Sequence, residues 1–299
     1  MQIRFEYDRI LSLRDNLHIL HEPGEGMLRR QKTRKENKEI IMNSIIKWIG
    51  GKHLLSKRII SLIPKHNIYC EVFGGAGWVL FGKSDDKKDW ITENNNKYTE
   101  VYNDINSDLI NFWKYIKFHP VAFVAELNQY LVSREIFDTL LQYEPRTELE
   151  QAVKFYYNLN CSYGALSENF TIQKGHRYLQ LRDLDIVKKA SERLKNVIIE
   201  KQDFEKLIKR YDTPDTFFYL DPPYYKNEHL YERNKTSRFG KHQELADILK
   251  SIDGKFLLSY NDDSFIRSLY RDFTIEEIEA PYTFNGRRSK TELLIRNYI

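Results

Sequence analysis

The stretch Thr216-Phe217-Phe218-Tyr219-Leu220-Asp221-Pro222-Pro223-Tyr224 decides the fold, because an apolar, aromatic run ends abruptly in a carboxylate and two prolines. Such a run is typical of a short strand that is buried on both faces of a parallel sheet. Prolines cannot donate to a sheet ladder, so the strand must stop at Asp221. In open α/β sheets, ligands bind at the carboxyl ends of the strands. We therefore expect Asp221 to lie at a cleft, before a stiff turn that presents the ring of Tyr224.

This turn suits the chemistry of an exocyclic amino group on a nucleobase, which is a poor nucleophile because its lone pair is delocalised into the ring. Asp221 and the backbone carbonyl of Pro222 can accept the two N–H bonds and return electron density to the nitrogen. Tyr224 can stack on a base that has left the duplex, and we expect its ring rather than its hydroxyl to matter. The alternative is an ordinary Pro-Pro turn beside a solvated carboxylate.

Further segments, in order along the chain, carry a resemblance to a known family. They are Lys47–Lys52 (KWIGGK), Glu71–Gly77 (EVFGGAG), Asn103–Ile110 (NDINSDLI), Asp221–Tyr224 (DPPY) and Asn285–Leu294 (NGRRSKTELL). From about residue 44 to its end, the chain resembles the Dam-like group of DNA adenine N6-methyltransferases, which use S-adenosyl-L-methionine. The resemblance implies an α/β fold with a Rossmann-like methyltransferase sheet of about seven strands, the last antiparallel, and an inserted, mainly helical DNA-recognition lobe.

The hydrophobic patterns predict where these elements lie. Besides the strand that ends at Asp221, we expect strands at 67–73, 100–104, 197–200, 256–260, 273–279 and 291–298. Helices are expected at 52–62, 107–117, 121–132, 134–143, 149–159, 183–195, 241–252 and 262–271, and a surface loop at 84–97. We assign residues 1–43 to an N-terminal extension, 44–106 and 196–299 to the catalytic domain, and 107–195 to the inserted target-recognition lobe.

The glycine-rich turn Phe73-Gly74-Gly75-Ala76-Gly77 follows the first expected strand, and its small residues let a ligand approach the backbone closely. The resemblance implies that this turn contacts the methionine part of the cofactor. Asp104, at the end of the second strand, can accept both hydroxyls of a ribose. The resemblance also implies that Trp48 and Lys52 lie near the cofactor and that Asp203 bonds the cofactor's adenine amino group.

Contacts with DNA are expected in two segments. The resemblance implies a recognition hairpin within residues 160–182, with Tyr163, Lys174 and Arg177 as its DNA-contacting residues. This stretch departs from the family's text, so the usual GATC target does not follow. In the loop before the last strand, the charges of Arg287, Arg288 and Lys290 suit phosphates, although a merely solvated basic loop would look the same.

Composition sets limits on the function. The net charge of +4 permits DNA binding without requiring it. Cys70 and Cys161 have no metal-ligand spacing and are expected to be buried free thiols, and His18 and His21 have no further ligands, so we assign no metal. Without a membrane-spanning run or a secretion signal, we expect a cytoplasmic protein.

The sequence thus predicts a site-specific DNA adenine N6-methyltransferase that binds double-stranded DNA and extrudes the target base. A restriction endonuclease is a further partner that this function allows. Two alternatives stay open: methylation of another amino group (cytosine N4, RNA or a protein glutamine), and a catalytically silent DNA-binding regulator. Asp221 and the Lys47–Lys52 segment favour adenine in DNA.

Overall fold

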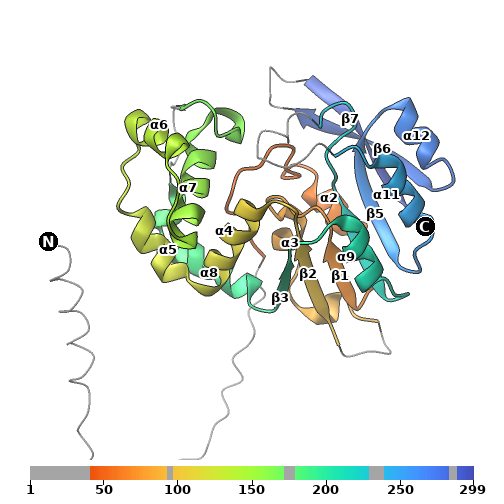
Figure 1. Cartoon of the computed structure of the whole chain (residues 1–299). Coiled ribbons are helices and arrows are strands. Elements are labelled where there is room, and N and C mark those ends of the chain that lie inside the picture. Colours follow the sequence, from red (N-terminus) through yellow and green to blue (C-terminus); the bar gives the residue numbers. More distant parts are fainter. Residues whose placement is uncertain (1–40, 93–96, 172–178, 229–238, 283–287) are drawn as a thin grey trace, which may run out of the picture. The chain divides into compact units, whose positions relative to one another are not determined.

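A seven-stranded mixed sheet organises residues 39–299 of the computed structural model (Figure 1). The structure describes residues 41–92, 97–171, 179–228, 239–282 and 288–299. The strands are β1 (Ile68–Glu71), β2 (Thr99–Asn103), β3 (Val197–Glu200), β4 (Thr216–Leu220), β5 (Lys255–Asn261), β6 (Thr274–Tyr282) and β7 (Arg288–Arg296). Their order across the sheet is β3-β2-β1-β4-β5-β7-β6.

The direction of the strands confirms the predicted sheet. Strands β1 to β5 pair in parallel, whereas β7 lies between β5 and β6 and runs antiparallel to both. The strand order reverses between β1 and β4, which are hydrogen-bonded neighbours. Such a switch point opens a crevice at the carboxyl ends of the flanking strands. Asp221 directly follows β4 and therefore lies at this crevice.

All residues of the central strand β4 are buried, which accounts for its apolar and aromatic composition. Phe217 and Tyr219 belong to a core that covers one face of the sheet, whereas Phe218 and Leu220 belong to the core on the other face. The first core includes residues of α2 (Ser56–Ser61) and α3 (Trp78–Gly82), and the second those of α9 (Phe204–Tyr211), α11 (His242–Leu249) and α12 (Ser264–Leu269). Helices on both faces are what a continuous apolar strand requires.

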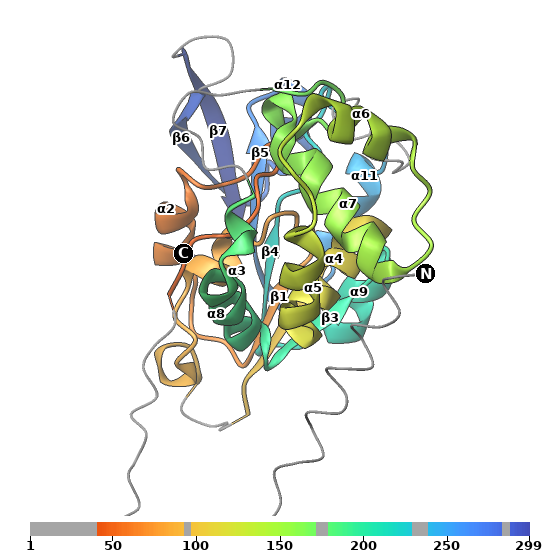
Figure 2. The same cartoon turned by 90° about the vertical axis from the view of Figure 1, so that its left-hand side faces the viewer.

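The chain between β2 and β3 is helical, as predicted, and is drawn in yellow and green in Figures 1 and 2. It holds α4 (Ser107–Phe118), α5 (Pro120–Leu127), α6 (Arg134–Gln142), α7 (Glu148–Cys161) and α8 (Leu184–Leu194). Two short 3-10 helices, Tyr163–Ala165 and Gln180–Arg182, lie between α7 and α8, and another, Lys87–Asp89, precedes β2. Its aromatic core continues into the sheet, since Trp113 Nε1 donates to the Tyr102 hydroxyl at 2.9 Å. The helices and the sheet therefore share one core.

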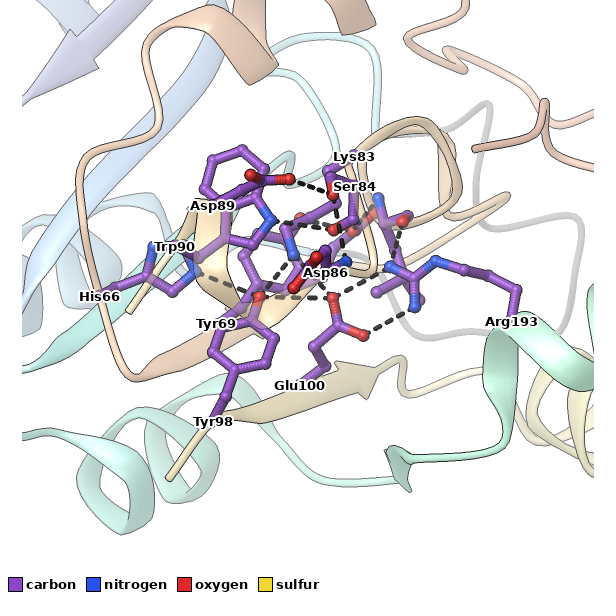
Figure 3. A network of polar contacts seen from close by, with 12 residues as sticks. His66, Tyr69, Lys83, Ser84, Asp86, Asp89, Trp90, Tyr98, Glu100 and Arg193 are labelled. Carbon is purple, nitrogen blue, oxygen red and sulfur yellow. Dashed lines mark hydrogen bonds and ion pairs between the residues drawn. The ribbon is translucent and has the colours of Figure 1, made fainter. Parts of the chain in front are cut away.

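A buried ionic cluster ties α8 to the sheet (Figure 3). Arg193 of α8 binds both carboxylate oxygens of Glu100 on β2, at 2.7 and 2.9 Å, and Lys83 Nζ binds the same carboxylate at 2.7 Å. Rings surround this lysine, with the centroids of Tyr69 and Trp90 each 4.7 Å from Nζ. Although burial alone would raise the pKa of Glu100, the charges of Lys83 and Arg193 outweigh it and hold that pKa at about 2.

Some boundaries differ from the prediction. Helix α2 begins at Ser56 rather than at residue 52, because Gly50 adopts a positive φ of 70° and residues 48–56 form successive turns. Asp104 follows β2 instead of ending it. Helix α9 was not predicted, although Phe204, Leu207, Ile208 and Tyr211 recur at helical spacing, so its apolar pattern was a usable signal. Cys70 and Cys161 are buried and free, as expected.

Candidate active site

A pocket of about 180 Å³ opens at the carboxyl ends of β1, β2 and β4. It gathers most of the residues that the sequence singled out for the cofactor and the chemistry. Those in its lining are Trp48, Lys52, Phe73, Gly74, Gly75, Ala76, Asp104, Asp203, Asp221 and Pro223. The lining also includes residues that the prediction missed: Ile49, Gly51, Glu71, Val72, Trp78, Val79, Asn103, Ile105, Asn106, Gln202, Phe204, Tyr219, Phe239 and Lys241. Gly77 and Pro222 lie beside this lining but not in it.

The glycine turn forms one wall of the pocket, and each glycine has a local steric reason. A Cβ on Gly74 would lie 2.3 Å from the Tyr102 ring. Gly75 has a φ of +50°, and a Cβ there would lie 2.8 Å from the Trp48 indole. The small residues therefore let Trp48 and Tyr102 pack directly on the backbone. Gly77, with a φ of +68°, precedes the five-residue helix α3.

Asp104 joins the glycine turn to the start of α4. Its carboxylate accepts hydrogen bonds from the backbone N–H of Gly75 at 3.0 Å and of Asn106 at 2.8 Å. Burial raises its pKa above the usual range, and backbone amides, those of Asn106 and Gly75 among them, partly offset that rise. A carboxylate has about four lone-pair directions, so these two bonds leave capacity for a ligand.

Asp203 lies at another wall and is the N-cap of α9. One oxygen accepts from Glu205 N at 3.0 Å, and the other is 3.2 Å from Lys241 Nζ. Beside it the ring of Phe239 packs edge-on against Phe73, with centroids 5.5 Å apart. This wall therefore combines a half-exposed ion pair with aromatic rings.

Asp221 lies at the floor, where it is bound by two side chains. Lys52 Nζ is 2.8 Å from Oδ1, and Ser259 Oγ donates to the same oxygen at 2.9 Å. Burial raises the pKa of Asp221, and the Lys52 ammonium acts in the opposite direction. Asp221 is therefore a partly buried, paired carboxylate, and the alternative of a freely solvated side chain is wrong.

The expectation that Tyr224 presents its ring to the cleft is wrong for this structure. Tyr224 is 6% exposed and does not line the pocket. Its ring stacks on Tyr260 with centroids 5.8 Å apart, and Lys52 Nζ lies 4.7 Å from its centroid. The hydroxyl, expected to be unimportant, donates to Glu292 Oε2 at 2.7 Å. The DPPY turn packs this ring inward because β5 and β7 supply partners for it.

Glu71 is a buried pocket residue to which the prediction gave no role. The Tyr69 hydroxyl at 2.7 Å and Leu80 N at 2.9 Å both donate to its Oε2. Burial raises the pKa of Glu71 to about 8, so it holds a proton at neutral pH. Its position was a usable signal, because Glu71 ends β1 much as Asp104 and Asp221 follow β2 and β4.

The structure describes only some of the residues that were expected to contact DNA. Lys174, Arg177 and Arg287 lie outside the described residues. Tyr163 is 49% exposed, Lys290 is exposed, and Arg288 is the first residue of β7. None of these three lines the pocket. Their roles toward DNA therefore remain predictions.

Within the described residues, no helix is long and apolar enough to cross a membrane. Nor does that part of the chain hold a group of three or more His, Cys, Asp or Glu side chains placed to bind a metal ion.

Comparison with known proteins gives a consistent result. The family model for D12 class N6 adenine-specific DNA methyltransferases matches residues 48–284. The chain is 29% identical to a type II methyltransferase of Lactococcus lactis subsp. cremoris over 88% of this chain and 98% of that protein. It is 26% identical to a type II methyltransferase of Paramecium bursaria Chlorella virus NC1A, over 86% of this chain and 100% of the relative. A DNA adenine methylase of Haemophilus influenzae is 26% identical, over 82% of this chain and 88% of its own length.

Proposed function

The chain belongs to the D12 class N6 adenine-specific DNA methyltransferases and methylates adenine in DNA at N6, and from this premise we propose that the pocket binds S-adenosyl-L-methionine and that Asp221 receives the target amino group. Membership of this family decides in favour of adenine N6 in DNA over the two alternatives, methylation of another amino group and a catalytically silent DNA-binding regulator. The single observation that carries the proposal is that Asp104, the glycine turn and Asp221 line one pocket.

The pocket fits the proposed cofactor in charge. Asp104, Asp203 and Asp221 contribute carboxylates and Lys52 and Lys241 contribute ammonium groups, while Glu71 holds a proton. This surplus of negative charge suits a ligand with a positive sulfur. When bound, S-adenosylmethionine supplies a methyl group on a sulfonium that is ready for direct displacement.

Different residues along the pocket would bind different parts of the cofactor. Trp48 and the Phe73–Gly77 turn would hold the methionine part, since the Trp48 indole packs on Gly75 and both line the pocket. Asp104 has acceptor capacity for the ribose hydroxyls. Asp203 would bond the adenine amino group beside its ion pair with Lys241. Lys52 acts at the boundary between the cofactor and Asp221.

For the reaction, Asp221 and the Pro222 carbonyl would accept the two amino N–H bonds of an adenine extruded from double-stranded DNA. Positioning and charge alignment then lower the barrier. Asp221 need not be a strong base, because the amino proton becomes acidic only once the nitrogen is methylated. An adenine can stack on Tyr224 only if Lys52 withdraws from the ring that it now covers.

Two substitutions test these roles separately. Asp104→Ala should weaken S-adenosylmethionine binding by about 1.5–3 kcal/mol, as for the loss of charge-assisted hydrogen bonds, measured by calorimetry on folded protein. Asp221→Asn should keep cofactor binding and lose methyl transfer to unmethylated plasmid DNA. Unchanged affinity in the first variant, or near-normal turnover in the second, would remove that residue from the site.

We also propose that Arg287, Arg288 and Lys290 hold DNA phosphates, whereas Tyr163, Lys174 and Arg177 contact bases. Neutralising Arg287 and Arg288 should weaken binding to all sequences alike and reduce the salt slope of log affinity by about 0.9 for each phosphate that the variant no longer binds. Substitutions at Tyr163, Lys174 and Arg177 should instead relax the choice of methylated site. Salt titrations and sequencing of methylated adenines check both, and the opposite pattern would reverse the assignment.

Because two of the relatives are named type II methyltransferases, we propose a restriction endonuclease as a cellular partner. Resistance of plasmid methylated by this chain to cleavage by an endonuclease from the same cells is the test.

A further inference from the structure

One partly buried carboxylate, Asp221, and one buried carboxylate, Glu292, share a lysine at the floor of the pocket. Lys52 Nζ is 2.8 Å from Asp221 Oδ1 and 4.0 Å from Glu292 Oε2. The side chains of Lys52 and Glu292 are 6% and 5% exposed. Asp221 follows β4, whereas Glu292 lies on β7, opposite Asn261 of β5. The sheet order brings these distant segments together.

In this arrangement Lys52 binds Oδ1, one of the two oxygens of the carboxylate that the reaction needs. An ammonium at 2.8 Å from Asp221 competes with the amino group of an incoming adenine for the same oxygen. Lys52 also lies over the Tyr224 ring, 4.7 Å from its centroid, and Tyr260 stacks on the same ring. An amino group that binds Oδ1 therefore displaces the Lys52 ammonium.

A buried ammonium cannot move without keeping a partner, since an unpaired buried charge costs several kcal/mol. Lys52 keeps the Gly50 carbonyl, at 3.0 Å, in its present position. Glu292 is the second carboxylate within reach, and a shift of about 1 Å would bring the ammonium to ordinary hydrogen-bond distance.

We propose that Glu292 is a positioning residue that takes over the Lys52 ammonium when Asp221 accepts the amino group of the target adenine. The inference rests on the role proposed above for Asp221. The Tyr224 hydroxyl donates to Glu292 Oε2 at 2.7 Å and so orients this carboxylate beside Lys52. Because Tyr224 belongs to the same turn as Asp221, Glu292 links the turn to Lys52.

The groups around Asp221 predict the direction in which its pKa should move when each neighbour is removed. Lys52 faces it from the segment before α2, Glu292 from β7 and Glu71 from β1, and the hydroxyls of Tyr219, Ser259 and Tyr260 complete its surroundings. After burial, the Lys52 ammonium lowers the pKa of Asp221 and the charge of Glu292 raises it. Removing the two neighbours should therefore move the Asp221 pKa in opposite directions.

The first experiment measures this pKa directly, in protein without DNA or cofactor, by ¹³C NMR of labelled aspartate carboxyls, with Asp221→Asn for assignment. Glu292→Gln keeps the shape and an acceptor for Tyr224 but removes the charge, and should lower the Asp221 pKa by about one unit. Lys52→Met should raise it by a similar amount. The control is Glu279→Gln, an exposed β6 residue in register with Thr291, the neighbour of Glu292.

The second experiment measures methyl transfer to unmethylated plasmid DNA. Because Lys52 would stay on Asp221, kcat of Glu292→Gln should fall about tenfold to hundredfold, with the KM for S-adenosylmethionine within about twofold of wild type. The acid limb of its pH–rate profile should move to lower pH. Glu292→Asp keeps the charge and should leave the acid limb in place, which also serves if the glutamine variant folds poorly.

The outcomes separate the inference from the function on which it rests. If Glu292→Gln matches Glu279→Gln in both the Asp221 pKa and kcat, Glu292 has no positioning role. If Asp221→Asn still methylates DNA, the proposed role of Asp221 fails, whereas the order of pKa values in the free protein would be unaffected.

Discussion

At the scale of single residues, Glu71 shows how burial changes the chemistry of a carboxyl group in the pocket. Its pKa of about 8 lies well above the usual 4.5, so between these pH values the folded protein holds a proton that the unfolded chain has released. Stability contributed by this group is complete below pH 4.5 and is lost as the pH rises toward 8. The neutral acid also keeps the pocket from carrying a further negative charge.

Glu71→Gln should therefore gain stability relative to wild type as the pH rises, because glutamine cannot ionise. Between pH 4.5 and 8, the difference in unfolding free energy should grow by roughly 2–5 kcal/mol in favour of the variant. Urea unfolding at several pH values measures it, with Glu192→Gln on the exposed face of α8 as the control. A difference that stays flat with pH would show that Glu71 is ionised in the folded protein.

At the scale of elements, local pattern predicted most strands and helices but not how they meet. The bounds of β3 match residues 197–200, and four of the five helices between β2 and β3 agree with their predicted ranges within two residues, because apolar periodicity is set by the residues of each element alone. Helix α5 ends at Leu127, five residues before its predicted end. The contact of Lys52 with Asp221 and Glu292 depends instead on β7 entering the sheet beside β5, which no local pattern specifies. The inward packing of Tyr224 escaped prediction for the same reason, since its partners Tyr260 and Glu292 lie on those strands.

The attachment of α8 to the sheet is an element-level feature that can be tested. Arg193 binds Glu100 of β2 (Figure 3) and also donates to the Leu80 carbonyl at 2.6 Å, so one guanidinium joins α8 to β2 and α3. Arg193→Met would remove one cation from a buried cluster and should cost about 3–5 kcal/mol of unfolding free energy.

The matched control lies two residues further on. Lys195 pairs with Glu192 at 3.3 Å, but both side chains are more than half exposed. Lys195→Met should therefore change stability by no more than about 0.5 kcal/mol. Equal effects of the two substitutions in thermal or urea unfolding would contradict a special role for the buried cluster.

At the scale of the whole molecule, the response to acid combines groups that act in opposite directions. Burial, with help from the charge of Lys83, lowers the pKa of His66 to about 4 from the usual 6.5. The unfolded chain therefore takes up this proton first, and His66 costs stability as the pH falls from 6.5 to 4. Glu71 works in the other direction over much of this window. Glu100, whose pKa falls from the usual 4.5 to about 2, loses its stabilising contribution only as the pH falls below about 4.5.

Wild-type stability should thus change little between about pH 4.5 and 6.5, because the proton uptake of His66 and that of Glu71 nearly cancel. His66→Asn removes one side of this balance and keeps a donor for the Pro64 carbonyl, which His66 Nδ1 contacts at 2.7 Å. Relative to wild type, the variant should gain up to about 3 kcal/mol of unfolding free energy on going from pH 6.5 to 4. His119→Asn, at an exposed position between α4 and α5, should show no such trend. Parallel pH profiles for His66→Asn and His119→Asn would mean that His66 is protonated in the fold, and that the cluster beside Lys83 tolerates a further positive charge.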